Sequence, residues 1–114
     1  MKKIISLIFF AALVISGWSS DIFPKIPNGW VNDYADILNA REENYLNQKL
    51  GWFEDSTSTQ IFIVTMNDHK DMPIEMLGAE IGEEWGVGQA GKENGMIILM
   101  YPSDKKITIQ TSVC

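Results

Sequence analysis

Apolar residues recur at helical spacing in the first half of the chain. Leu46, Leu50 and Phe53 follow one another at intervals of four and three residues, which places them on one face of a helix. Asn39 precedes this run, and Glu42 stands three residues after Asn39, an arrangement typical of a capping box. The pattern therefore predicts a helix that begins after Asn39 and buries one apolar stripe.

A second helix is predicted after Pro73, because proline is well tolerated in the first turn of a helix. Its apolar positions again follow helical spacing and are Ile74, Leu77, Ile81 and Trp85. We expect this helix to pack its apolar face on a sheet.

Three segments read as strands. Residues 60–66 are β-branched, aromatic or apolar on both alternating faces, which predicts a central strand covered on both sides, and residues 96–101 predict a second buried strand. A turn at residues 102–105 leads to a third strand, from Lys106 to about Val113, in which Ile107 and Ile109 alternate with polar residues. Residues 30–38 show no sustained period, and we expect a packed loop or a short helical turn there.

The order of these elements predicts an α/β fold. A strand, a helix and a strand in succession favour a parallel crossover, and the short turn before the last strand favours an antiparallel hairpin partner. We therefore expect a small mixed β-sheet, with a parallel βαβ crossover and a C-terminal antiparallel hairpin strand, flanked by helices.

The first 20 residues have the features of a signal peptide. Lys2 and Lys3 precede an apolar run from Ile4 to Ile15, which is shorter than the roughly 20 residues that a spanning helix needs, and small residues follow the run. We interpret residues 1–20 as a signal peptide, residues 21–29 as an extended lead-in and residues 30–114 as one domain. The protein is then exported to the periplasm or the extracellular space, and its mature chain has no transmembrane segment.

Charge narrows the range of partners. Removing Lys2 and Lys3 from the nine basic residues leaves seven against fifteen acidic ones, which takes the formal net charge from −6 to −8. An acidic surface repels phosphate backbones, so nucleic acid is not expected as a partner. Cys114 is the only cysteine and is the last residue, so the domain has no internal disulfide.

One glycine-rich stretch has the letters of a nucleotide-binding loop but not its setting. Residues 86–91 read G-x-G-x-x-G and Lys92 follows them. A phosphate-binding loop leaves a strand and opens a helix, whereas this loop leaves a predicted helix and enters a predicted strand. We reject nucleotide binding and interpret the loop as a helix end at Gly86 and a turn at Asn94 and Gly95.

Catalytic groups are sparse. His69 is the only histidine and is interpreted as a solvated loop residue, and no serine or threonine has an evident base. Carboxylates in or beside loops are the remaining candidates, and Asp33 and Asp104 are proposed as metal ligands. The spacing of a dedicated calcium loop is absent, so the alternative of a solvated acidic surface stays open, and for Asp33 so does that of a cap for a turn or helix.

Three stretches resemble the TPM domain family of bacterial envelope and thylakoid-lumen proteins. Residues 31–38 resemble its opening V-N-D-x-A-x-x-L, residues 59–65 its first strand, and residues 84–95 its W-G-x-G-x-x-G-K-x-N-G loop. The positions that match the family motif are Asp33, Trp85, Gly86, Gly88, Gly91, Lys92, Asn94 and Gly95. The resemblance covers about residues 25–111.

The resemblance implies a mixed sheet flanked by helices and a role in the assembly or maintenance of membrane protein complexes. Some relatives have acid phosphatase activity and bind calcium, which is the only cofactor that the sequence suggests. Relatives continue past the third strand with a G-Y-G-x-E segment, whereas this chain reads Thr-Ser-Val-Cys from residue 111. We therefore expect a domain that is incomplete at its C-terminus, with part of its sheet uncovered.

Two hypotheses of function follow. The preferred one is a non-catalytic envelope module that binds other envelope or membrane proteins. The alternative is a calcium-dependent acid phosphatase that uses Asp33 and Asp104, with Lys92 near the phosphate.

Overall fold

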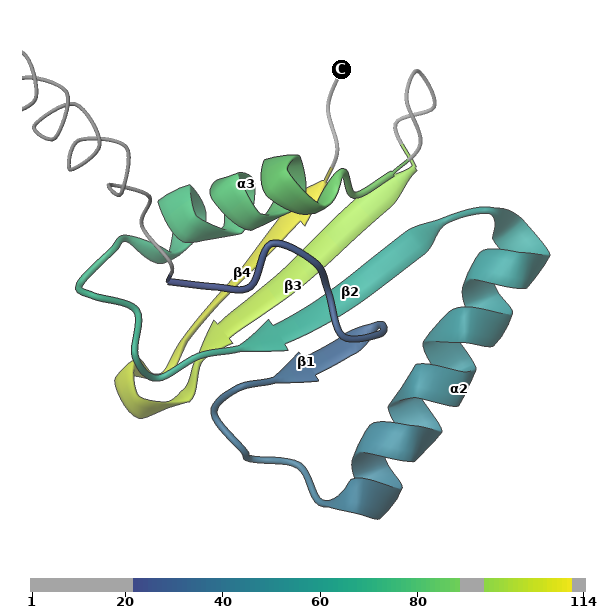
Figure 1. Cartoon of the computed structure of the whole chain (residues 1–114), viewed down its shortest axis with the longest axis horizontal. Helices are drawn as coiled ribbons and strands as arrows, with labels where there is room; N and C mark the ends of the chain where they lie inside the picture. The colour runs from purple at the N-terminus through teal and green to yellow at the C-terminus, as the bar shows by residue number, and fades with distance from the viewer. Residues whose placement is uncertain (1–21, 89–93, 112–114) are drawn as a thin grey trace, which may run out of the picture.

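The computed structural model describes residues 22–88 and 94–111. Four strands form one sheet in the order β1-β2-β3-β4 (Figure 1). The strands are β1 (Val31–Asp33), β2 (Gln60–Thr65), β3 (Gly95–Tyr101) and β4 (Lys106–Thr111). The first three are parallel to one another, and β4 runs antiparallel to β3. The predicted mixed sheet, with its hairpin partner at the end, is confirmed.

The expected packed loop at residues 30–38 is wrong for residues 31–33, which form the edge strand β1. Val31 pairs with Ile63, and the Ile63 amide donates to the Trp30 carbonyl at 2.8 Å. A strand of three residues that includes Asn32 and Asp33 has no readable alternation. Its strand character comes from hydrogen bonds to β2, which the local sequence does not reveal.

Two helices flank the sheet, as expected. Helix α2 (Ala40–Thr57) follows Asn39, whose side chain accepts the Glu42 amide at 2.8 Å, while the Glu42 carboxylate accepts the Asn39 amide at 3.0 Å. The predicted capping box is therefore present. Helix α3 (Ile74–Trp85) ends at Gly86, which adopts a left-handed conformation with φ of 62°. Among the described residues no helix has the length and apolar character needed to cross a bilayer.

One face of the sheet packs on α3 and contains the main core. Gly78 lets α3 pack close to β4, because a Cβ atom at Gly78 would lie 2.9 Å from the side chain of Gln110 and 3.3 Å from that of Thr108. The buried residues of this core are Val64, Met66, Ile74, Leu77, Ile81, Ile97, Leu99 and Tyr101.

The opposite face of the sheet is only partly covered. Helix α2 contacts β1 and β2, and Val31 is fully buried there. Because neighbouring residues of a strand point to opposite faces, the residues that alternate with the α3 core point away from α3. On β3 and β4 they are Met96, Ile98, Met100, Ile107 and Ile109, a set that we call the open face. Ile107 and Ile109 are 61% and 57% exposed.

Candidate functional site

Asp33 lies at the carboxyl end of β1, where both of its oxygens accept hydrogen bonds. Oδ1 accepts from the Thr65 hydroxyl at 2.6 Å and from the Ile37 amide at 3.1 Å, and Oδ2 accepts from the Leu38 amide at 2.8 Å. Thr65 is fully buried and its hydroxyl oxygen also accepts the Ala35 amide. Asp33 therefore closes the loop between β1 and α2, as the cap interpretation predicts.

Electrostatics at Asp33 agree with this role. Burial acts to raise the pKa of the Asp33 carboxyl, but hydrogen bonds from Thr65, Leu38 and Ile37 act in the other direction and leave the pKa below 3.8. The carboxylate is thus held in its charged form by donors from its own loop and from β2.

The interpretation of His69 as a solvated residue is wrong. Its side chain is 14% exposed, its Nε2 lies 2.8 Å from Asp104 Oδ2, and its ring stacks on Tyr101 with ring centroids 3.8 Å apart. The Tyr101 hydroxyl donates to the Met72 carbonyl at 2.9 Å. Burial first, and then the charges of Asp104 and Glu75, raise the pKa of Tyr101.

This histidine and tyrosine join the two loops at the carboxyl ends of β2 and β3. The same junction is reinforced by Asn67, whose Oδ1 accepts from both the amide and the hydroxyl of Ser103. Asp104 belongs to the turn η1 (Pro102–Asp104), whereas His69 precedes α3. The contacts tie the loops to each other and leave His69 Nδ1 buried without a hydrogen-bond partner.

The structure places Asp33 and Asp104, the two predicted metal ligands, at the same edge of the sheet but in separate hydrogen-bond networks. Within residues 22–88 and 94–111 no group of three or more histidine, cysteine or acidic residues is close enough to hold a metal ion. Calcium binding by Asp33 and Asp104 stays a prediction.

The glycine-rich motif lies at the opposite end of the strands, before the start of β3, and its described residues have structural roles. Gly88 has φ of 83°, and its amide donates to the Gln60 side chain at 2.8 Å. A Cβ atom at Gly95 would lie 2.5 Å from the Gly88 nitrogen, so only glycine fits there without a backbone shift. The Asn94 amide group donates to the Ser58 carbonyl, and the Asn94 carbonyl accepts the Gln60 amide at 2.9 Å.

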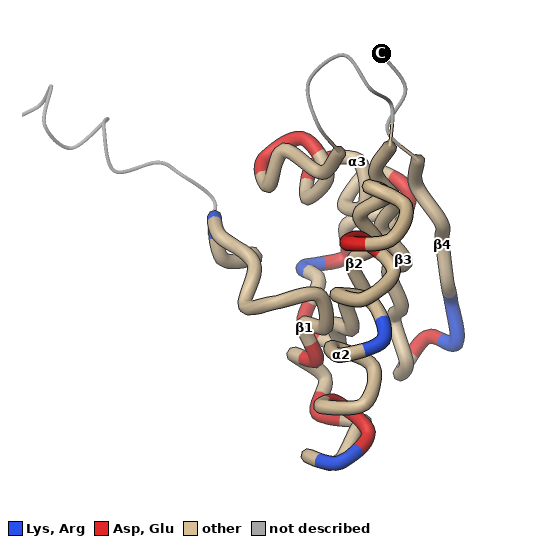
Figure 2. The backbone as a smooth tube through the Cα atoms, turned by 90° about the vertical axis from the view of Figure 1, so that its right-hand side faces the viewer, with Lys and Arg blue, Asp and Glu red and all other residues tan. Residues whose placement is uncertain are grey.

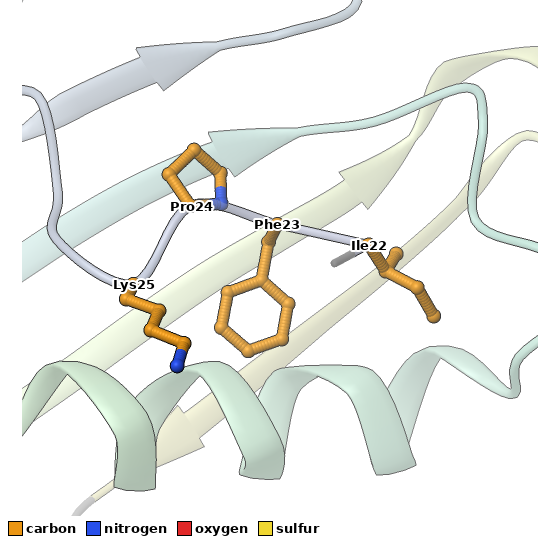
Figure 3. Close-up of a pocket in the computed structure, with 4 residues that line it drawn as sticks. All are labelled: Ile22, Phe23, Pro24 and Lys25. Carbon is orange, nitrogen blue, oxygen red and sulfur yellow. The ribbon is translucent and has the colours of Figure 1, made fainter. Parts of the chain in front are cut away.

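Trp85, the aromatic residue of the motif, fastens the lead-in to the core. Its indole N–H donates to the Pro24 carbonyl at 2.7 Å, and its ring meets those of Phe23 and Phe62 edge to face. Figure 3 shows the Phe23 ring pointing from the lead-in toward α3. The extended lead-in is therefore a packed part of the domain.

The motif and the two aspartates are not brought together by the described residues. Gly91 and Lys92 lie outside the described residues, but Gly88 and Asn94 are at the amino end of β3, while Asp33 is at the carboxyl end of β1. The amino and carboxyl ends of a strand of six residues lie about 20 Å apart. The sequence order against a phosphate loop is confirmed, since the motif leaves α3 and enters β3.

The lead-in lines a hollow on the surface of the described residues. A surface hollow is lined by the lead-in residues Ile22, Phe23, Pro24 and Lys25, shown as sticks in Figure 3. None of these residues is an acid, and Lys25 is the one of the four with an ionisable side chain. Several large apolar side chains are exposed among the described residues, but Ile107 and Ile109 lie on one face of a strand beside the half-buried Met96, Ile98 and Met100 of β3, so they belong to a patch rather than standing singly.

The sequence of β4 shows that apolar and polar residues alternate. It does not show which of the two sets faces α3. Thr108 and Gln110 lie against α3 at Gly78, whereas Ile107 and Ile109 point to the other side. The strand thus presents its polar side chains to the helix and its isoleucines outward. Only the register with β3 shows this inversion.

Comparisons with known proteins agree with the fold. The sequence model of the TPM domain matches residues 31–113. The solution NMR structure of the N-terminal domain of a protein from P. gingivalis superposes with a TM-score of 0.66 at 24% sequence identity. The match covers 72% of this chain and 52% of that one, so the chain spans about half the length of this solved relative. No curated protein matches the chain.

At this identity the structural likeness supports the fold alone. The family match, in contrast, covers most of the chain and includes β1, β2, β3 and β4 as well as the motif loop. The chain therefore belongs to the TPM domain family.

Proposed function

We propose that this protein is an exported, non-catalytic interaction module of the cell envelope that binds a protein partner through its open face. The observation that supports this proposal is the pair Ile107 and Ile109, which lie more than half exposed on a regular strand. Burying an isoleucine side chain contributes about 1.5–3 kcal/mol, so covering both would be a substantial driving force for association.

Charge around the open face favours a protein partner. All five of its side chains are uncharged, and β4 carries charge only at its start (Figure 2). Interfaces are depleted of charge at their centre and enriched in apolar residues such as Met, as this surface is. The role in the assembly or maintenance of membrane protein complexes, which the family resemblance implies, is the setting that we propose for this binding.

The proposal is tested by a photo-crosslinking residue placed at Ile109. The full 114-residue chain would be produced in a bacterial host, illuminated in intact cells and then fractionated. We expect a crosslinked protein adduct in the envelope fraction, because the side chain at this position faces the bound partner. The absence of any adduct at Ile109 would overturn the proposal.

Met76 provides a matched control. It is also apolar and 53% exposed, but it lies on α3, across the sheet from the open face. The same crosslinker at Met76 should give no adduct. Equal labelling from both positions would mean that the open face has no special role.

A phosphatase assay tests the alternative. Under the proposed function, Asp33→Ala leaves the hydrolysis of a phosphate ester at the background rate of the unaltered protein, with calcium and without it. Calcium-dependent hydrolysis that this substitution abolishes would replace the interaction module with the enzyme.

A further inference from the structure

We propose that Asn28 and Gly29 form a site of spontaneous covalent modification, at which the folded protein converts Asn28 to aspartate and isoaspartate. The reaction belongs to the asparagine–glycine pair itself and needs no enzyme. The site lies between the lead-in and β1 and involves no residue of the open face. A second asparagine–glycine pair occurs at Asn94 and Gly95, and the structure gives the two pairs opposite environments.

Glycine after asparagine favours an intramolecular reaction, because glycine has no Cβ atom to hinder its nitrogen or to restrict its rotation. The Gly29 nitrogen attacks the side-chain carbonyl carbon of Asn28, and the new carbon–nitrogen bond closes a succinimide ring. The side-chain amide bond of Asn28 breaks, and its nitrogen leaves as ammonia together with the hydrogen that the Gly29 nitrogen loses. Water then opens the ring at either of its two carbonyls, which gives aspartate or isoaspartate.

The segment that contains Asn28 and Gly29 has the access to water and the freedom of movement that this reaction needs. Both residues are exposed, and Ile26 in the same segment is 78% exposed. The segment spans two anchored points, Pro24 with its hydrogen bond to the core before it and β1 after it. Because little of the segment is packed, ring closure requires only a local movement.

The hydrogen bonds of this turn leave both reacting groups free. Asn32 is buried, and its side chain accepts the main-chain N–H of Asn28 at 2.7 Å and donates to the Gly29 carbonyl at 3.2 Å. Ring closure uses other atoms of the two residues. Within the described residues no hydrogen bond holds the Asn28 side chain or the Gly29 N–H. The reaction can therefore begin without first breaking a hydrogen bond.

The pair at Asn94 and Gly95 is held in place. The Asn94 side chain donates to the Ser58 carbonyl, and the Asn94 carbonyl accepts the Gln60 amide at 2.9 Å. Gly95 is buried as the first residue of β3, where a Cβ atom would lie 2.5 Å from the Gly88 nitrogen. Moving the Asn94 side chain onto the Gly95 nitrogen requires this end of β3 to open first. Folding therefore protects this pair.

Isoaspartate at position 28 should loosen the turn before β1. Its main chain runs through the former side chain and is one atom longer between the Asn28 N–H and the Gly29 carbonyl, the two groups that Asn32 binds. The two bonds cannot both keep their present geometry, so the buried Asn32 side chain loses a partner. Aspartate at the same position keeps the main chain and both bonds, and adds only an exposed charge.

Peptide mapping of the aged full-length protein is the first measurement. Trypsin places the two pairs in separate peptides, residues 26–41 and 93–105. After incubation at physiological temperature and mildly alkaline pH, mass spectrometry and chromatography should find at least about tenfold more conversion at Asn28 than at Asn94, which reacts only after local opening. In urea both pairs should convert at similar rates.

Two results of this comparison would overturn the proposal. One is equal conversion of the two pairs in the folded protein. The other is an unchanged Asn28 in the folded protein after a time in which the denatured chain has reacted at both pairs.

Asn28→Gln is the matched control, because glutamine keeps an exposed amide but must close a larger ring. Ion exchange of the aged unaltered protein should yield a more acidic fraction, and the aged Asn28→Gln protein should yield much less of it. Equal acidic fractions would place the reaction at another residue and contradict the proposal.

The stability of the acidic fraction tests the consequence for the turn. Asn28→Asp carries the same added charge on a normal main chain. The acidic fraction, which contains isoaspartate, should unfold at a lower urea concentration than Asn28→Asp, because only its turn is lengthened. Identical midpoints of unfolding would show that the turn is not loosened.

Discussion

At the scale of single residues, Asp33 has a hydrogen-bond donor for each of its side-chain oxygens. It is both a position of the family motif and a predicted metal ligand. Asp33 connects β1 to β2 through Thr65 and holds two amides of the following loop. A residue can match a family motif because it builds the loop, without contacting a ligand. The substitution of Asp33 separates these roles.

We predict that Asp33→Asn lowers the free energy of unfolding at pH 7 by about 1–3 kcal/mol, because the amide group replaces one acceptor oxygen with a donor. The pKa of Asp33 is lowered in the folded protein, so its charged form contributes stability above pH 3.8, and this contribution is lost as the pH falls through the folded pKa. Urea denaturation at pH 7 and near pH 2 should show a difference between variant and unaltered protein that shrinks in acid.

Asp36→Asn is the control for that experiment. Asp36 is exposed in the same loop and has φ of 54°, a conformation that asparagine tolerates well. Its substitution removes the same charge and should change stability by less than about 0.5 kcal/mol. Equal losses for both variants would mean that overall charge, rather than the hydrogen bonds of Asp33, is responsible.

At the scale of elements, the sequence predicted both helices, the three longer strands and the hairpin. Those predictions succeed because capping residues, proline and periodic apolar positions act locally. The short strand β1 and the contact between His69 and Asp104, 35 residues apart, depend on pairings between distant segments. For the same reason the alternation of β4 was readable, but the direction of its isoleucines was not.

The start of α2 gives the second prediction. Asn39→Ala removes the side chain that accepts the Glu42 amide and should destabilise the protein by about 1 kcal/mol. Thermal unfolding followed by circular dichroism measures the effect. Glu42→Gln keeps an acceptor for the Asn39 amide and should lose less; a larger loss for Glu42→Gln would show that the charge of Glu42 matters more than the cap.

The close packing at the start of β3 gives the third prediction. Gly95→Ala forces a Cβ atom against the backbone of Val87 and Gly88, so we expect a loss of about 1–3 kcal/mol, in the range of overpacked sites. Gly86→Ala is the comparison, because a Cβ atom at Gly86 meets nothing within 4 Å and only its positive φ is strained. Chemical denaturation should therefore show the larger loss for Gly95→Ala.

At the scale of the whole molecule, the sheet divides the domain into two unlike sides. The α3 side has a continuous core that the lead-in completes through Phe23 and Trp85, whereas the α2 side leaves β3 and β4 open. Most of the buried core therefore lies on the packed side. The proposed partner belongs to the open side.

The fourth prediction concerns the packed lead-in. Trp85→Phe removes the hydrogen bond to the Pro24 carbonyl but keeps an aromatic ring, so the lead-in should loosen while the core stays folded. Trypsin should cleave after the exposed Lys25 more rapidly, while hydrogen exchange stays unchanged at the Leu77 and Leu99 amides in the core. Faster exchange throughout would mean that Trp85 supports the whole domain.

Docking of the lead-in also fixes the direction from which the domain can be held. Ile22 and Phe23, labelled in Figure 3, pack against the core on the α3 side. The chain therefore enters the domain across the sheet from the open face. Anything joined to the chain ahead of Ile22 is thus attached on the α3 side and leaves β4 accessible from the other side.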